Sequence, residues 1–268
     1  MVKGKDLMVF LALPLLMVAA IFFLGAGGST ADTKGYDWYF QPNEEHRQPQ
    51  VAGEVDLSGH SVIYCGDGQS KKVSITFDAG FDKGTHAPIL DTLKEKGVSA
   101  TFFVDGNFIK QNEDLVRRMD AEGQIIGNHT LHHPDMTKLT DLSAYRTQID
   151  GWNEILRGYG IEPSGYFRFP QGRFSARALD YNELLGLKTV FWSFAYYDWV
   201  EEDQPNPQAA LQKIMSRMHN GCILLLHSTS QTNEQILGDL IDQLRAEGYE
   251  IVPLTQMQKN GRSPHRFL

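Results

Sequence analysis

The chain has 268 residues, of which 41% are hydrophobic and 22% charged, so it can bury a substantial core and has the composition of a folded soluble protein. Its formal net charge of −8 offers no basic surface for phosphate contacts, which argues against nucleic acid as a partner. Two cysteines, Cys65 and Cys222, could pair in an oxidising compartment, but we expect free thiols because Cys222 opens the apolar run CILLL.

The N-terminus carries a pattern for export. Lys3 and Lys5 precede an apolar run from Leu7 to Ala26, and small residues follow. The run also reaches the length of about 20 residues that spans a bilayer. We therefore predict that residues 1–31 are a signal peptide or an uncleaved N-terminal membrane anchor. Either one places the rest of the chain outside the cytoplasm, in the cell envelope.

The remaining chain divides into an irregular and a regular part. Residues 32–70 are interpreted as an extended lead-in, in which short apolar pieces from Val51 onward could add a hairpin. From Lys71 the chain alternates between apolar strand segments and amphipathic helical segments. The strands are expected at 72–77, 98–104, 124–128, 165–169, 187–194, 221–227 and 249–253. The helices are expected at about 85–96, 112–122, 142–159, 175–186, 207–218 and 233–247.

This alternation predicts an α/β fold. Strand segments such as ATFFV, TVFW and ILLL are almost continuously apolar, as expected when helices cover both faces of a mainly parallel sheet. The length favours a single domain with a distorted (β/α) barrel of about seven strands. Catalytic groups in such folds gather at the carboxyl ends of the strands, so polar residues at those ends are the candidate site.

Asp78 ends the first regular strand, in KVSITFDAGFDKG, and glycines behind it let the backbone turn. It is a candidate general base, although an aspartate here is by itself more often a turn-forming residue. Arg168 lies at a later strand end, in RFPQG. It could pair with Asp78 and lower the pKa of that carboxyl, or it could be a surface arginine at a turn.

Histidines follow the strand at 124–128. His129 and His133 could project from one face, as on a helical turn, and bind one metal ion. The pair of His129 with His132 is the steric alternative. An HxxxH pattern is a weak signal alone, but its place directly after a strand, in phase with Asp78, strengthens it.

The last two strand ends supply an acid and its partner. His227 ends ILLL, the most apolar strand, and is either a satisfied core residue or a general acid. Asp198, followed by Trp199, is its candidate partner, because a neighbouring carboxylate raises the pKa of a histidine. Five polar clusters, each at a predicted strand end, together predict one catalytic site.

The order of TFDAG, HTLHH, RFPQG, DW and LLLHS resembles the polysaccharide deacetylases with a NodB-type domain, carbohydrate esterase family four, over about residues 72–255. GNHTLHHPD, FWSFAYYDW and LLLHSTSQTNEQIL resemble most the sporulation delta-lactam-forming de-N-acetylases, which act on N-acetylmuramic acid in spore-cortex peptidoglycan. The resemblance implies a deacetylase domain at 71–256, with a polar tail at 257–268. We expect a monomer that acts on peptidoglycan glycan strands.

The resemblance also implies roles for the catalytic candidates. Asp78 becomes the base that activates water, and Arg168 orients it. His227 protonates the leaving amine and is tuned by Asp198. The backbone N–H of Gln171 is offered to the oxyanion. These roles agree with what amide hydrolysis requires.

For metal and substrate, the resemblance makes His129 and His133 the ligands of a divalent cation, zinc or a similar ion. Trp199 is a substrate-binding candidate. Arg173, five residues after Arg168, is the cation that we expect to recognise the lactyl carboxyl of muramic acid.

One position departs from the family pattern. Ala79 stands where the family has a metal-binding aspartate, and a catalytic zinc normally has three protein ligands. Asp82 could supply the missing oxygen, water could take its place in a weaker or different site, or metal-dependent catalysis could be lost. The resemblance suggests that the delta-lactam branch as a whole lacks this aspartate.

Three functions follow, in order of preference. The first is removal of the N-acetyl group from N-acetylmuramic acid, which leads to muramic delta-lactam. The second is deacetylation of N-acetylglucosamine in peptidoglycan or another polysaccharide. The third, suggested only by Ala79, is a catalytically silent glycan-binding protein of the envelope.

Overall fold

The computed structural model describes residues 33–52 and 56–257, all within one compact unit. The predicted signal peptide or anchor at 1–31 and residues 258–268 of the predicted tail lie outside this part. Within it, no helix combines the length and apolar character needed to cross a membrane.

A parallel sheet forms the centre of the domain. Its strand order is β11–β5–β6–β7–β8–β10–β4, and β12 also pairs with β5. All neighbouring strands in this path are parallel. Phe194, after β10, bridges to Leu224 in β11 and so links the two sides of the sheet. The predicted mainly parallel, distorted barrel is confirmed. The strands are β4 (Val62–Ile63), β5 (Lys72–Ala79), β6 (Thr101–Val104), β7 (Ile125–Asn128), β8 (Tyr166–Phe167), β10 (Lys188–Val190), β11 (Ile223–His227) and β12 (Glu250–Ile251).

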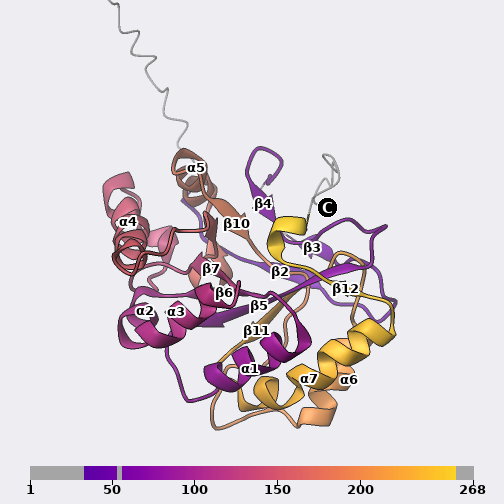
Figure 1. Cartoon of the computed structure of the whole chain (residues 1–268). Coiled ribbons are helices and arrows are strands. Elements are labelled where there is room, and N and C mark those ends of the chain that lie inside the picture. Colours follow the sequence, from indigo (N-terminus) through magenta and orange to yellow (C-terminus); the bar gives the residue numbers. More distant parts are fainter. Residues whose placement is uncertain (1–32, 53–55, 258–268) are drawn as a thin grey trace, which may run out of the picture. The chain divides into compact units, whose positions relative to one another are not determined.

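Helices cover the sheet, with α1, α6 and α7 side by side and α2 against α4 (Figure 1). The stripe of apolar residues in α4, predicted from its three- and four-residue spacing, is buried from Tyr145 to Leu156. Most of these helices begin at an Asp, Ser or Asn whose side chain caps the first turn. The helices are α1 (His86–Lys96), α2 (Gly106–Gln111), α3 (Glu113–Ala121), α4 (Leu142–Gly158), α5 (Ala176–Leu184), α6 (Pro207–Ser216) and α7 (Gln231–Ala246).

Several predicted elements differ in detail. The strands expected at 98–104 and 187–194, for example, are shorter, at Thr101–Val104 and Lys188–Val190. The helix expected at 112–122 is preceded by a separate short helix, α2, because Asp105 caps a new start and Asn112 interrupts the helical backbone with φ −131° and ψ 45°. The strand expected at 165–169 is shorter, because Pro170 has no N–H to donate and begins a 3₁₀ turn.

The predicted lead-in is part of the domain. Its strand β1 (Tyr36–Asp37) pairs with β9 (Arg173–Phe174), and β4 joins the main sheet. A hairpin does form, but earlier than expected, between β2 (Tyr39–Gln41) and β3 (Gln50–Ala52). Trp38, between β1 and β2, stacks its ring on Phe191 with centroids 4.1 Å apart. At the other end, Met257, the first residue of the predicted tail, is buried in the core.

Cys65 and Cys222 are free thiols, as expected, and both are buried. They face each other in an isolated antiparallel bridge. Burial raises the pKa of Cys65 to about 12, so this thiol is protonated and unreactive at neutral pH.

Candidate active site

Neighbouring strands deliver charged side chains to one edge of the sheet. Asp78 in β5 and His227 in β11 are direct register partners. His129 follows β7, and Arg168 follows β8. The resulting cleft encloses about 710 Å³, which is within the range of about 300–1,000 Å³ for ligand sites.

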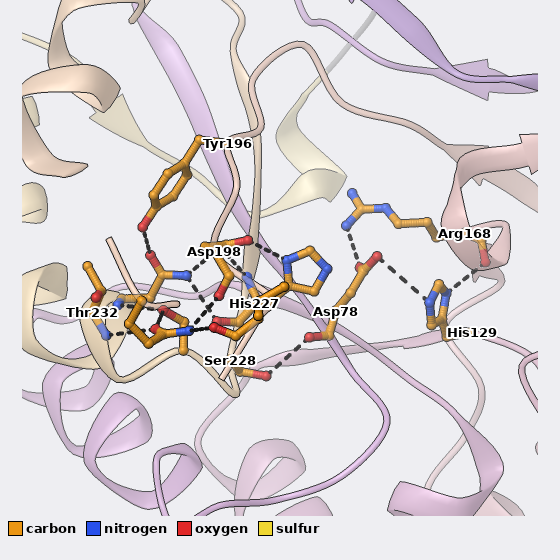
Figure 2. Close-up of polar contacts among 12 residues, drawn as sticks. Asp78, His129, Arg168, Tyr196, Asp198, His227, Ser228 and Thr232 are labelled. Atoms are coloured by element: carbon orange, nitrogen blue, oxygen red, sulfur yellow. Dashed lines mark hydrogen bonds and ion pairs between the residues drawn. The ribbon is translucent and has the colours of Figure 1, made fainter. Parts of the chain in front are cut away.

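Asp78 is held as an ionised carboxylate. Its Oδ1 accepts a 2.7 Å hydrogen bond from Nη1 of the fully buried Arg168 (Figure 2). Nη2 of Arg168 donates to Thr76. Burial alone would raise the pKa of Asp78, but the charge and hydrogen bond of Arg168, with the charge of His227, outweigh it and lower that pKa. Asp78 can therefore accept a proton at neutral pH, and the expected pairing with Arg168 is present.

His129 is a neutral imidazole with a defined tautomer. Its Nδ1 lies 2.9 Å from the carbonyl oxygen of Arg168, which can only accept, so Nδ1 carries the hydrogen. Its Nε2 faces Asp78, 3.8 Å from Oδ2. Burial lowers the pKa of His129 to about 4. The nitrogen that faces the cleft thus has a free lone pair at neutral pH.

The neighbour of His129 is His133, and their ring centroids are 4.8 Å apart, whereas His132 is exposed. A loop holds the pair, not the helical turn that we predicted. Thr130 and His133 adopt positive φ values of 74° and 54°. Gly106 lets α2 approach this loop, since a Cβ there would lie 2.6 Å from a backbone oxygen.

Two histidines do not complete a metal site. Ala79 is buried at the cleft and has no donor atom. Asp82 lies outside the cleft, and its Oδ1 accepts a 2.6 Å hydrogen bond from His86, which corrects its proposed role as substitute ligand. Among the described residues, no three His, Cys, Asp or Glu side chains are grouped to hold a metal ion. The donors do not fit a catalytic zinc with three protein ligands.

The surroundings of His227 favour its protonated, positively charged form. Its Nδ1 donates to Oδ1 of the fully buried Asp198 at 2.7 Å, and its backbone N–H donates to Oδ2 at 2.9 Å (Figure 2). Burial alone would lower the pKa of His227, but the hydrogen bond and charge of Asp198, with the charge of Asp78, raise it. His227 can therefore donate a proton.

The substrate-binding candidates lie in different places. Gln171 lines the cleft and holds a positive φ of 58°, an unfavourable conformation for a residue with a Cβ. Trp199 also lines it, with its ring centroid 5.7 Å from that of His227. Arg173 does not line the cleft, and its charge is already paired with Asp37 and Asp135 at 3.0 and 3.1 Å. We therefore withdraw its assignment to substrate recognition.

Sequence reasoning missed two residues of this site. Asn233 donates to Oδ2 of Asp198 at 2.6 Å and to the carbonyl of His227 at 3.0 Å, and it accepts from Tyr196. Asp105 lines the cleft directly after β6, and burial raises its pKa. Asp105 follows a strand as the other candidates do, so the same rule could have found it. Asn233 lies in the first turn of α7, where no periodic pattern marks it.

An ionised carboxylate and a protonated imidazole at one cleft can activate water and protonate a leaving group. These are the needs of amide hydrolysis. The fold and the site together define a hydrolase built on a parallel (β/α) barrel.

Comparison with known proteins gives the family. The model of the polysaccharide deacetylase family matches residues 66–190. The chain is 34% identical over 236 residues to the Bacillus subtilis peptidoglycan-N-acetylmuramic acid deacetylase PdaA, covering 86% of this chain and 89% of that protein. The structure of PdaA, a family 4 carbohydrate esterase, matches with a TM-score of 0.80 at 33% identity, over 84% of this chain and 97% of that one. The chain belongs to the polysaccharide deacetylases of carbohydrate esterase family four, which hydrolyse N-acetyl amide bonds, as predicted.

Other members differ from PdaA in their described activity. A peptidoglycan-N-acetylglucosamine deacetylase from Listeria monocytogenes is 31% identical over 194 residues, or 70% of this chain and 39% of that protein. A structure from Bacillus anthracis, described as a family pseudoenzyme, is 26% identical with a TM-score of 0.67, over 73% of this chain and 68% of that one. Sugar preference and catalysis must therefore be argued from this chain's own residues.

Proposed function

We propose that this protein removes the N-acetyl group from N-acetylmuramic acid in peptidoglycan, in the cell envelope. The observation that carries the proposal is the matched pair of charge states, an ionised Asp78 backed by Arg168 and a protonated His227 backed by Asp198. The similarity to a muramic acid deacetylase over most of both chains supports this choice of sugar.

The first step is attack by water. Asp78 takes a proton from the water molecule while the oxygen of that water bonds to the acetamide carbonyl carbon. The electron pair of the carbonyl moves onto its oxygen, and the backbone N–H of Gln171 donates to the resulting oxyanion. Arg168 keeps Asp78 ionised and fixes Oδ1, which leaves Oδ2 for the water.

The second step releases the amine. His227 donates a proton to the sugar nitrogen as the C–N bond breaks, and the products are acetate and a free amino sugar. Asp198 holds Nδ1, so the acidic proton is on Nε2. The proton on Asp78 passes to solvent, and His227 takes one back. We further propose that the freed amine condenses with the lactyl carboxyl of the same sugar, with loss of water, to give the delta-lactam.

His129 and His133 are the proposed ligands if zinc or a similar divalent cation binds. Because the described donors do not complete a site for such an ion, no step above depends on it. The neutral state of His129 suits either metal binding or a hydrogen bond from the substrate water.

A pair of matched substrates tests the proposed sugar. Peptide-free glycan strands contain muramic acid, whereas oligomers of N-acetylglucosamine lack the lactyl group. We expect kcat/KM for acetate release to be at least tenfold higher for the glycan strands than for the oligomers of N-acetylglucosamine. Equal rates, or a preference for N-acetylglucosamine, would favour the activity of the Listeria relative.

A second candidate function rests on Ala79. Loss of a metal-binding carboxylate, together with similarity to a family pseudoenzyme, favours a glycan-binding protein without catalysis. That candidate predicts that strands bind to the folded protein without release of acetate, with or without added zinc. The retained acid and base support the enzyme, because a binding protein needs neither.

A further inference from the structure

A buried chain of hydrogen bonds lies directly behind the catalytic pair. Nδ1 of His86, the first residue of α1, lies 2.6 Å from Oδ1 of Asp82. Nε2 of His86 lies 2.8 Å from Oγ of Ser228, the residue that follows His227. Both His86 and Ser228 are fully buried. Burying an imidazole is costly unless its polar atoms are paired, and here both ring nitrogens are paired although His86 takes no part in the proposed reaction.

The hydrogen bonds of this chain have one direction. Burial lowers the pKa of His86 in spite of the Asp82 carboxylate, so the ring is neutral at neutral pH. The carboxylate of Asp82 can only accept, so Nδ1 of His86 carries the hydrogen and Nε2 has the lone pair. The hydroxyl of Ser228 therefore donates to Nε2.

A carboxylate, a histidine and a serine bonded in this order also form the triad of serine hydrolases, where the serine attacks the substrate. Ser228 is not placed for attack, because it has no exposed surface and does not line the cleft. The role of these three residues is therefore to hold the structure of the site, without a nucleophile among them.

Ser228 joins the strand ends of the base and the acid. Its backbone N–H and its Oγ each lie 3.4 Å from the carbonyl oxygen of Asp78 (Figure 2). Its own peptide bond connects it to His227. A shift of Ser228 would therefore change how the carboxylate of Asp78 and the imidazole of His227 face each other. Misplacing a reacting group by about 1 Å can lower a rate about 10²-fold.

The start of α1 gives a second, independent contact to the same residue. Thr85 occupies the N-cap position of α1 but does not cap its first turn, as a threonine there commonly does. Its hydroxyl donates instead to the carbonyl oxygen of Ser228 at 2.6 Å. Helix α1 is itself fixed, because Ile89, Leu90 and Leu93 are buried in the core. Two consecutive residues of a fixed helix start thus hold both the side chain and the backbone of Ser228.

We propose that His86 is a positioning residue for the base and the acid. Held by Asp82, it fixes Ser228 against the strand end of Asp78. The direction in which Asp78 and His227 face the substrate follows from this contact. The inference rests on the proposed function, because it assigns His86 to the catalytic pair of that reaction. His86 lies outside the cleft, so its loss should lower kcat and leave KM unchanged.

Two substitutions of His86 separate its two contacts. The amide of His86→Gln reaches as far as Nε2 and can accept from Ser228, whereas the amide of His86→Asn reaches only as far as Nδ1 and can donate to Asp82. We expect His86→Asn to lower kcat about tenfold at an unchanged KM, and His86→Gln to retain most of kcat. An unchanged kcat in folded His86→Asn, or an equal loss in both variants, would overturn the inference.

A remote histidine supplies the matched control. Nε2 of His60 lies 3.0 Å from Oδ1 of Asp180, and neither residue lines the cleft. His60→Asn breaks this histidine–aspartate pair and should leave both kcat and KM unchanged. A loss of kcat equal to that of His86→Asn would show that breaking any such pair lowers activity, which would contradict a specific role for His86.

A double variant shows whether His86 and Ser228 act through one contact. Ser228→Ala removes the hydroxyl that donates to His86, so it should lower kcat by a factor similar to that of His86→Asn. Combining the two substitutions should then cause little further loss, because the contact is already absent. Losses that multiply in the double variant would contradict the inference.

Amide hydrogen exchange tests the positioning without catalysis. The backbone N–H groups of His227 and Ser228 donate to Asp198 and to the carbonyl of Asp78. In His86→Asn we expect these two amides to exchange about tenfold faster, while amides in the middle of β5 and β11 keep their rates. This result would support the inference even if the protein releases no acetate. Unchanged rates at the two amides, or equal acceleration of all slow amides, would overturn it even if the enzyme is active.

Discussion

Asp78 and His227 occupy directly paired positions on adjacent parallel strands, β5 and β11. Each has its own buried partner of opposite charge, Arg168 for Asp78 and Asp198 for His227 (Figure 2). One pair lowers the pKa of a carboxyl and the other raises the pKa of an imidazole. A carboxylate that can take a proton and an imidazole that can give one thus lie on neighbouring strand ends.

The pH profile of kcat/KM should follow these two groups. The pKa of Asp78 is lowered from 3.8 and that of His227 is raised from 6.5, so both are in their active states between these values. We expect activity to fall as the pH rises through the pKa of His227, above 6.5. In Asp198→Asn this basic limb should move to lower pH, because burial then lowers the His227 pKa. Kinetics across the pH range check this, and a limb that stays in place would contradict the pairing.

The buried ion pair should affect stability with a definite pH dependence. Arg168→Met leaves the carboxylate of Asp78 buried without compensation, which costs about 3–5 kcal/mol in the free energy of unfolding. Because the folded pKa of Asp78 is lowered, the pair stabilises the protein above the unfolded pKa of about 3.9 and loses this effect as the pH falls through the folded value. The cost should therefore be largest at neutral pH and shrink in acid.

Chemical denaturation of a second variant controls for this prediction. In the Arg168→Met, Asp78→Asn double variant neither position of this pair carries a buried charge, so part of the stability should return. A double variant as unstable as Arg168→Met alone would show that packing, and not charge, explains the loss.

Restoring a carboxylate at position 79 should create a metal site. Ala79→Asp would place a third donor near His129 and His133, so its affinity for zinc should exceed that of the wild type at least tenfold. Competition with a chelating dye measures this. Asp82→Ala is the control and should leave the affinity unchanged, because Asp82 is bound to His86. Loss of zinc binding in Asp82→Ala would show that Asp82 is a metal ligand after all.

Asn233 should matter although no substrate contact is assigned to it. Asn233→Ala removes the 2.6 Å hydrogen bond to Asp198 and leaves the buried hydroxyl of Tyr196 unpaired. We expect a loss of about 1–3 kcal/mol in the free energy of unfolding. If Asn233 positions Asp198, the basic limb of the pH profile should also shift. A loss of stability with an unchanged profile would mean that its role is structural alone.

The site residues that the sequence predicts are those whose position is set by a local sequence pattern. Asp78, His129 and His227 each end or follow an apolar strand, and parallel pairing brings such positions to one edge. Arg168 was predicted in the same way, and its pairing with Asp78 followed from charge. Asp105 also follows an apolar strand, so the same rule applies to it, and its side chain in addition caps α2.

The parts that sequence missed depend on contacts between distant segments. Arg173 resembles a free cation in the sequence, but strand β1 brings Asp37 beside it. The same pairing makes the lead-in part of the domain. Asp82 lies only four residues from Asp78, yet its turn directs it to His86 and away from the cleft. No local pattern contains such information.

The measurement that tests the central claim most directly is acetate release from peptide-free glycan strands that contain muramic acid. The wild type is compared with Asp78→Asn and with Asp239→Asn, a control on the exposed side of α7. All three proteins are assayed after chelation and again with zinc added. We predict release by the wild type and the control, and a rate about 10²–10⁴-fold lower in folded Asp78→Asn. Equal release by Asp78→Asn, or no release by folded wild-type protein under either condition, would contradict the account.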